Sequence, residues 1–336
     1  MDVLGLTFDD VAAALRPRPG QIQALRATYR QLMRGQMADG PLRADLLPIV
    51  RDVRDGELTK FVQRTPDGLE IESVLVPMYG RWRTWKTLCV SSQIGCARGC
   101  TFCETAQLGL LRNLTAGEIV GQVVAAQCKF GQPVRNVVFM GMGEPLDNYD
   151  HVLQALRVLS DPSGLSLAKE RLTISTAGRT RGIRALASLG WRRLNLAISL
   201  NAPNDEIRSR IMPINRLEPL AVLRDALLAY PLRNCQFFMI AYVLIPGVND
   251  APAHARQLAE YLRPLKCVAN IIPYNPRLDS PWPAPTDDAV ARFLRGLEAT
   301  GQPCLRRITK GRDQMAACGQ LGNRALARPV RAHTGA

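Results

Sequence analysis

The sequence predicts an α/β fold: an incomplete (βα)6 barrel preceded by a small accessory domain of helices and a strand. From residue 87 onward, short apolar runs alternate with amphipathic segments, as expected for parallel strands joined by right-handed helical crossovers. About six such units are present, fewer than the eight of a closed barrel. A doubly wound sheet is the alternative architecture.

Residues 1–85 have a different pattern from the rest of the chain. Helical periodicity covers Phe8–Leu15 and Gln21–Arg34, and alternation over Glu70–Pro77 predicts a strand. We expect these residues to form the accessory domain. A core of residues 86–322 and a loose basic tail of residues 323–336 should follow.

The core contains recognisable strand and helix signals. Thr115 is expected to cap a helix, because its hydroxyl and the Glu118 carboxylate can form a capping box. Pro219 suits a first helical turn, and Gly301 suits a left-handed helix end. The expected strands are Thr87–Ser91, Asn136–Met140, Arg171–Ser175, Asn195–Leu200, Gln236–Leu244, Val268–Pro273 and Leu305–Thr309.

Composition limits the functional classes. The chain has 336 residues with 43 Lys+Arg and 29 Asp+Glu, a net charge of +14, which favours a polyanionic partner. No run reaches the roughly 18 consecutive apolar residues of a membrane span. The N-terminus is acidic, unlike a signal peptide. We therefore expect a cytoplasmic, monomeric protein without a membrane partner, whose nine cysteines are not a disulfide framework.

Four cysteines follow the first expected core strand closely. They are spaced Cys89-x6-Cys96-x3-Cys100-x2-Cys103, on the kind of strand-end loop that carries barrel active sites. Four thiolates could close a structural zinc site. Alternatively, the last three could hold a [4Fe–4S] cluster with one iron left open, or the thiols could carry no metal. The x3-then-x2 spacing differs from paired zinc-ribbon modules and favours iron–sulfur.

The Cys96–Cys103 triplet resembles that of the radical S-adenosylmethionine (SAM) superfamily, and further motifs match it in order. The segment GMGEP resembles the superfamily motif that holds the amino group of SAM. Other matching residues end successive strands. The resemblance implies a partial radical-SAM barrel and a SAM site formed by Gly143, Glu144, Ser175, Ser199, Leu200, Asn201 and Asn275.

A narrower resemblance covers most of residues 70–322. The segments TLCVSSQIGC, FMGMGEPLDN, SLNAPNDEIR, MPIN, IPYNP and AACGQL together resemble the RlmN/Cfr family of radical-SAM RNA adenosine methyltransferases. This implies methylation of an adenosine ring carbon in 23S ribosomal RNA, with transfer RNA as a further candidate. It also implies an electron donor such as flavodoxin or ferredoxin.

The family resemblance gives three residues chemical roles. Cys318 would take a methyl group from a first SAM, and a radical from a second SAM would activate it for addition to adenine. Glu72 would remove the ring proton, and Cys89 would attack Cys318 to release the product. A radical is needed because carbon 2 or carbon 8 of adenine is electron-poor and cannot simply attack a methyl sulfonium. Pro145 favours carbon 2, whereas the approach to Cys89 is nearer to the carbon-8 type.

Several features depart from the family pattern. Asn201 stands where the family usually has His, the N-terminal helix signature is missing, and the spacer between Glu72 and Cys89 is long. These features motivate a second hypothesis, a radical-SAM enzyme acting on a peptide or small molecule. A third is a non-enzymatic zinc-stabilised RNA-binding protein. For Glu72 the alternative is a solvent-facing strand carboxylate.

One segment before Cys89 has the composition of an RNA-binding surface. Residues 81–86, RWRTWK, interleave cations with aromatic rings, which suits phosphate contact and base stacking. The alternative is a hairpin with a solvated charged face. Cations near Cys318 could steer phosphate toward it, namely Arg306, Arg307, Lys310 and Arg312.

Overall fold

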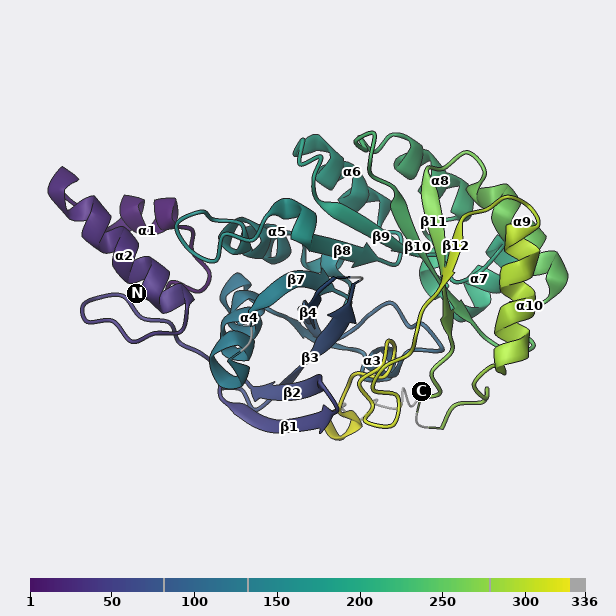
Figure 1. Cartoon of the computed structure of the whole chain (residues 1–336), viewed down its shortest axis with the longest axis horizontal. Coiled ribbons are helices and arrows are strands. Elements are labelled where there is room, and N and C mark those ends of the chain that lie inside the picture. The colour runs from purple at the N-terminus through teal and green to yellow at the C-terminus, as the bar shows by residue number, and fades with distance from the viewer. Residues whose placement is uncertain (81, 132, 278, 327–336) are drawn as a thin grey trace, which may run out of the picture.

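The computed structural model describes all residues except 81, 132, 278 and 327–336. Within them, a ten-stranded sheet has the order β1-β2-β3-β4-β7-β8-β9-β10-β11-β12 (Figure 1). Its strands are β1 (Ile49–Asp55), β2 (Leu58–Arg64), β3 (Glu70–Tyr79), β4 (Thr84–Cys89), β7 (Val134–Phe139), β8 (Leu172–Thr176), β9 (Asn195–Ser199), β10 (Phe238–Leu244), β11 (Cys267–Pro273) and β12 (Cys304–Arg306).

Two pairing patterns meet at β4. Strands β1 to β4 pair antiparallel, whereas β4 pairs parallel with β7, and each later neighbour is also parallel. Every expected core strand is present, so the α/β fold with a partial parallel barrel is confirmed. Strands β1 and β2, which the sequence pattern did not predict, extend the same sheet.

Helices cover the outside of the parallel strands. They are α4 (Ala116–Phe130), α5 (Tyr149–Leu159), α6 (Thr180–Ser188), α7 (Asp205–Ile211), α8 (Leu220–Leu228), α9 (Pro252–Leu262) and α10 (Asp287–Glu298). The expected capping box begins α4: the Thr115 hydroxyl accepts from the Glu118 amide at 3.2 Å, and the Thr115 amide donates to Glu118 Oε2 at 2.9 Å. Because the helices bury only the outer face, the inner face remains available for a site.

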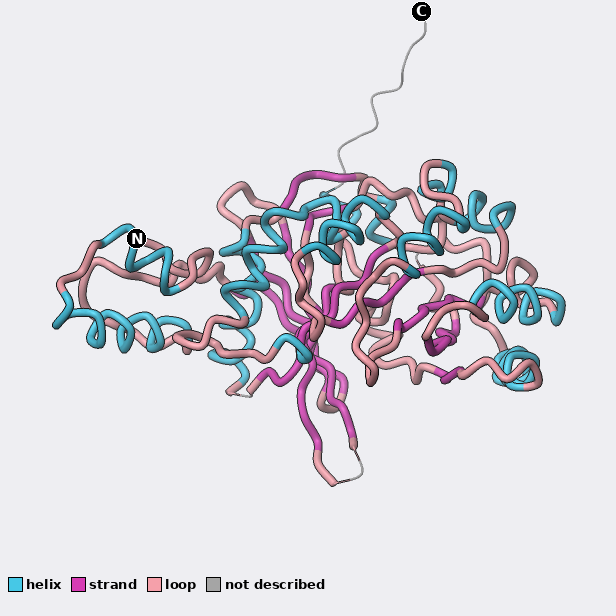
Figure 2. The backbone as a smooth tube through the Cα atoms, turned by 90° about the horizontal axis from the view of Figure 1, so that it is seen from above, coloured by secondary structure: helices cyan, strands magenta, loops and turns pink. Residues whose placement is uncertain are grey.

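Helices α1 (Phe8–Leu15) and α2 (Ile22–Met33) match the expected N-terminal helices to within one residue. They lie at one end of the molecule, beyond α5 and away from α9 and α10 (Figures 1 and 2). The buried carboxylate of Asp161 joins them to the core, since its Oδ2 accepts from the Phe8 amide at 2.6 Å. Residues 1–85 thus combine this helical unit with strands that continue the core sheet.

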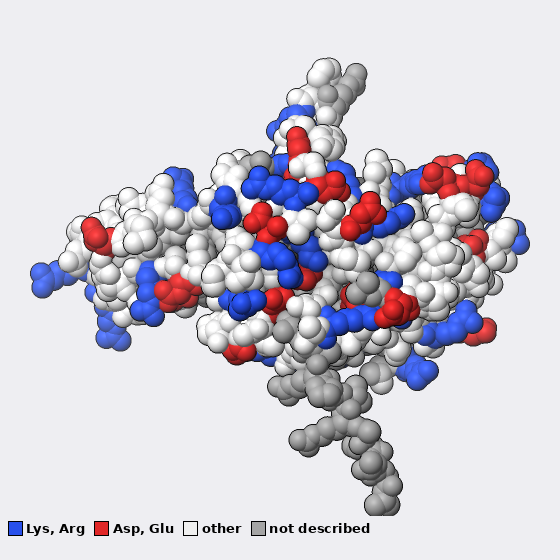
Figure 3. Space-filling view, turned by 90° about the horizontal axis from the view of Figure 1, so that it is seen from below, with Lys and Arg blue, Asp and Glu red and all other residues white. Residues whose placement is uncertain are grey.

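Charge is mixed on the face shown in Figure 3. Lys and Arg alternate there with Asp and Glu, so the net charge of +14 does not form one basic patch on that face. Among the described residues, no helix is long and apolar enough to cross a membrane.

Candidate active site

The loop of residues 96–103, here called the cluster loop, is closed at its base by two short strands. β5 (Gln93–Gly95) pairs antiparallel with β6 (Leu110–Asn113), and the Cys96 amide donates to the Gly109 carbonyl at 2.8 Å. Gly95 has φ 78°, and a Cβ there would lie 1.8 Å from the Gly109 oxygen. Only glycine permits this close approach.

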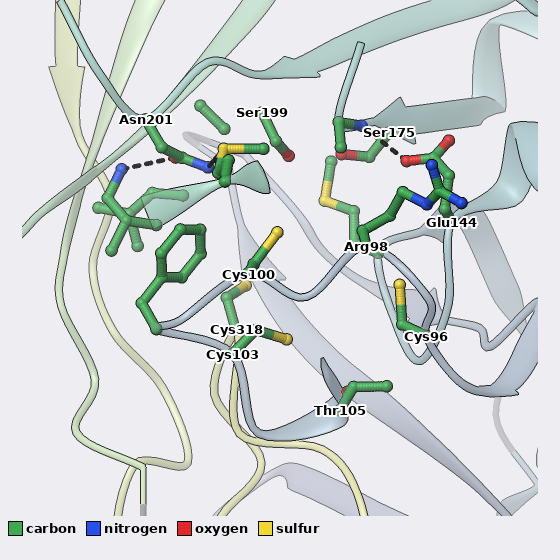
Figure 4. Close-up of a pocket in the computed structure, with 18 of the residues that line it drawn as sticks. Cys96, Arg98, Cys100, Cys103, Thr105, Glu144, Ser175, Ser199, Asn201 and Cys318 are labelled. Atoms are coloured by element: carbon green, nitrogen blue, oxygen red, sulfur yellow. Dashed lines mark hydrogen bonds between the residues drawn. The ribbon is translucent and has the colours of Figure 1, made fainter. Parts of the chain in front are cut away.

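Cys96, Cys100 and Cys103 line one pocket at the carboxyl ends of the parallel strands, together with Cys318 (Figure 4). Burial raises the pKa of all three cluster-loop thiols, that of Cys96 to about 12. Such thiols ionise readily when a metal binds them. A [4Fe–4S] cluster is ordinarily held by four cysteines, so one held by three would leave its fourth iron open to another ligand. Three thiols on one loop, facing a shared pocket, fit that group.

Glu144 provides a buried carboxylate on the wall of this pocket. Its Oε1 accepts from the Leu146 amide at 3.0 Å, and its Oε2 accepts from the Ala177 amide at 2.7 Å. Burial outweighs these bonds and raises the pKa of Glu144 to about 7. Gly143 holds the turn at φ 100°, where a Cβ would lie 2.6 Å from Gln93 Cβ. The carboxylate is placed to pair with a ligand ammonium.

Other predicted SAM-binding residues also line the pocket: Ser175, Ser199, Asn201 and Asn275. Asn201 has φ 57°, a left-handed conformation that Asn tolerates, and its Oδ1 accepts from the Val243 amide at 2.9 Å. Leu200 is different. Its side chain is fully buried in the main hydrophobic core and is not among the pocket-lining residues of the described chain.

The Cys318 loop, residues 311–322, reaches the pocket from the far end of the chain. The Glu104 amide donates to the Gly319 carbonyl at 2.7 Å, and the Thr105 hydroxyl donates to the Leu321 carbonyl at 2.5 Å. Asn275 Nδ2 donates to the Cys318 carbonyl at 3.3 Å. These bonds join the Cys318 loop directly to the segment that follows the cluster loop.

Cys89 lies at the end of β4 and is absent from the described residues that line the pocket. Burial and the charge of Cys318, opposed by Arg307, raise its pKa to about 12. The two thiols are therefore close enough to interact electrostatically. The structure has no disulfide between Cys89 and Cys318.

Glu72 is only 2% exposed, so the solvent-facing alternative is wrong. Its Oε2 lies 2.8 Å from Lys60 Nζ and accepts from the Gly322 amide at 3.0 Å. Lys60, on β2, also donates to the Met315 carbonyl at 2.9 Å. The buried pair thus ties the Cys318 loop to β2 and β3 at Met315 and at its last residue, Gly322. The sequence pattern gave no signal for Lys60, because β2 itself was not predicted.

Arg208 is a second residue that sequence reasoning missed. It is fully buried, and its guanidinium donates to the carbonyls of Leu200 at 3.1 Å and Ala177 at 2.6 Å. It also donates to Asn215 Oδ1 at 2.9 Å. Arg208 therefore holds together the loops that follow β8 and β9. Its only sequence signal is its place within the SLNAPNDEIR segment.

Replacement of Lys60 by Met is expected to loosen the Cys318 loop. Removing one partner of a buried ion pair leaves the Glu72 carboxylate uncompensated and should cost about 3 kcal/mol of unfolding free energy. The urea midpoint should fall, and alkylation of Cys318 by iodoacetamide should accelerate several-fold. Arg54→Met, which breaks an exposed pair with Asp52, is the control and should cost less than about 1 kcal/mol. Equal Cys318 alkylation in both variants would show that other contacts hold the loop.

The sequence and the fold of this chain both resemble those of radical SAM proteins. The sequence model of the radical SAM superfamily matches residues 90–259. The crystal structure of a radical SAM methyltransferase from Sphaerobacter thermophilus superposes with a TM-score of 0.86. That protein is 38% identical, and the match covers 95% of this chain and 98% of the other.

Curated relatives carry a more specific name. The dual-specificity RNA methyltransferase RlmN of Geobacter sulfurreducens is 46% identical over 96% of this chain and 92% of its own length. The protein of the same name from Syntrophotalea carbinolica is 46% identical over 83% of this chain and 73% of its own length. The chain therefore belongs to the RlmN family of RNA methyltransferases, within the radical SAM superfamily, as its motifs predicted.

Proposed function

We propose that this protein methylates a ring carbon of an adenosine in RNA and that Cys318 carries the transferred carbon. The observation that supports this most is the position of Cys318, which lines the same pocket as Cys96, Cys100 and Cys103. A zinc-stabilised binding protein would have no use for a cysteine there. Family membership likewise favours RNA over a peptide or small molecule.

Cys96, Cys100 and Cys103 would hold a [4Fe–4S] cluster. Gly143, Glu144, Ser175, Ser199, Asn201 and Asn275 would bind SAM around it. Once bound, these groups supply the electron and the carbon radical that methylation of an electron-poor ring requires. Leu200 contributes its backbone to the same turn, since its amide bonds to the Ala241 carbonyl at 3.0 Å.

The remaining roles fall to residues around the Cys318 loop. Cys318 acts as the nucleophile that accepts the methyl group, and its carbonyl bond to Asn275 positions it. Cys89 then attacks the Cys318 sulfur, so a disulfide forms between the two cysteines as the bond from Cys318 to the product carbon breaks. Glu72 takes the ring proton before the product is released. Lys60 and the Gly322 amide both contact its Oε2 and hold the carboxylate beside the Cys318 loop.

The finer assignments follow the family motifs. Pro145 supports carbon 2 as the target, and 23S ribosomal RNA is the proposed substrate, with transfer RNA as a second. A flavodoxin or ferredoxin would deliver the electron to a monomeric enzyme.

Nucleoside mass spectrometry tests the proposal directly. The protein would be expressed in a bacterium that lacks its own carbon-2 methyltransferase, beside a Cys318→Ala control. Ribosomal and transfer RNA would be digested separately. We expect Cys318-dependent 2-methyladenosine in ribosomal RNA, whereas 8-methyladenosine would move the assignment to carbon 8. Absence of both products, with SAM cleavage intact, would refute the proposed substrate.

A further inference from the structure

The inner face of the barrel is open at the edge formed by the starts of the parallel strands, here called the N-terminal rim. Met239, Ala241 and Val243 alternate along one face of β10, and all three line the pocket. Met239, nearest the rim, is 37% exposed. Leu305 pairs in register with the pocket residue Asn270 and is 63% exposed. The pocket therefore continues along the inner face to solvent at this rim.

β4 runs along the same route and ends beside the reacting cysteines. Trp85, Thr87 and Cys89 share one face of this strand because side chains alternate along it. Trp85 lies near the N-terminal rim, and four residues of strand place it about 13 Å from Cys89. An aromatic ring thus stands at the outer end of the route that leads to Cys89.

One arginine lies over this tryptophan, and two more lie at the starts of the neighbouring strands. The Arg135 guanidinium lies over the Trp85 ring, 5.0 Å from its centroid. Arg83 and Arg171 directly precede β4 and β8, the two strands that pair with β7, on which Arg135 lies. Burial and the charges of Arg171 and Arg83 lower the pKa of Arg135. In the part of the chain that the structure describes, none of them forms an ion pair with Asp or Glu.

Two arginines at the opposite end of the barrel are paired with an acidic residue. There Arg98 and Arg179 each lie 2.8 Å from Asp147, so their charges are compensated. The Cys318 loop also covers that end, where Glu104 holds Gly319. The three arginines of the N-terminal rim, in contrast, have no Asp or Glu partner among the described residues, so this rim attracts a polyanion.

The hairpin of β3 and β4 extends the rim outward. Figure 2 shows these two strands projecting beyond the rest of the sheet. Near its tip, Trp82 is 85% exposed and Tyr79 is 61% exposed. Exposed aromatic rings beside cations are the surface on which unpaired bases stack.

We propose that RNA docks on the N-terminal rim, with its phosphates on Arg83, Arg135 and Arg171, and that the target base enters along the inner face toward Cys89. This proposal rests on the proposed function and specifies how its substrate reaches the site. Single-stranded or unpaired RNA is the occupant, because the rim combines uncompensated cations with stacking rings and ends at the methylating thiols. A duplex would have to extrude its base first.

Binding of transcribed 23S ribosomal RNA to the full-length protein tests the surface. Two triple variants would be compared. The rim variant carries Arg83→Gln, Arg135→Gln and Arg171→Gln, and the control variant carries Arg184→Gln, Arg256→Gln and Arg292→Gln. The control set removes the same charge from exposed positions on α6, α9 and α10. The rim variant should bind at least about tenfold more weakly, and the slope of log K against log salt should fall by about 2. Trp82→Ala, at an exposed position, should also weaken RNA binding. It replaces the rim variant as the test if the rim variant fails to fold.

Equal losses of RNA affinity in the rim and control variants would overturn the proposal, because they would show that net charge alone attracts the RNA. Undiminished binding of the rim variant and of Trp82→Ala would also overturn it. The proposed function fails separately, when the unaltered protein transfers no methyl group to RNA. Methyl transfer by the unaltered protein together with an unaffected rim variant would refute only the docking surface.

Discussion

Cys89→Ala is expected to leave RNA covalently joined to the protein through Cys318, whereas Cys318→Ala is expected to leave RNA wholly unmodified. The two thiols act at different steps of the proposed route. Without Cys318 no carbon is accepted, so no bond to RNA can form. Without Cys89 the carbon is transferred to adenine, but nothing attacks Cys318 to break its bond to the product.

Denaturing gels with labelled RNA measure this difference. The Cys89→Ala protein should show a nuclease-trimmed adduct on the peptide that contains Cys318, and product release should fall by several orders of magnitude. Cys235→Ala is the matched control, because Cys235 is an exposed thiol outside the pocket lining. It should behave like the unaltered protein.

Two outcomes would contradict these roles of Cys89 and Cys318. Released methylated RNA from Cys89→Ala at the normal rate would exclude Cys89 as the resolving residue. Adducts formed by Cys318→Ala would move the carbon-carrying role to another thiol.

The sequence predicted the parallel strands well because their physical signals are local. Their outward residues are apolar and packed under helices, as with Ile240, Tyr242 and Leu244 on β10, all of which are fully buried. Strand ends carried the polar residues of the pocket, and parallel strands bring their carboxyl ends together. Most of the candidate site followed from that rule.

The antiparallel strands were missed because their patterns are not local. β1 is largely exposed and rich in charge, and β2 buries the polar residues Lys60 and Gln63. Lys60 bonds to the Cys318 loop, which is distant in sequence, and Gln63 bonds to the Leu47 carbonyl before β1. The partners of Glu72 and Arg208 likewise come from separate segments, so their roles required the folded structure.

Glu144→Gln is expected to weaken SAM binding at pH 7 and to remove its pH dependence. In the ligand-free protein, burial raises the pKa of Glu144 to about 7, so acid converts the carboxylate into a neutral form that cannot pair with the SAM ammonium. Affinity should therefore fall as the pH drops below 7, on the order of tenfold between pH 7 and pH 5.5. Glutamine carries no charge at any pH and should give a flat profile.

Glu144→Gln is also expected to destabilise the protein when no SAM is bound. The amides of Ala177 and Leu146 both donate to the Glu144 carboxylate, whereas a glutamine oxygen can face only one of them. The orphaned donor should cost about 1–3 kcal/mol of unfolding free energy. Equilibrium dialysis with cluster-loaded protein would measure binding, and Glu260→Gln, an exposed carboxylate on α9, would be the control. A pH profile of Glu144→Gln as steep as that of the unaltered protein would assign the titration to another group and remove Glu144 from ammonium recognition.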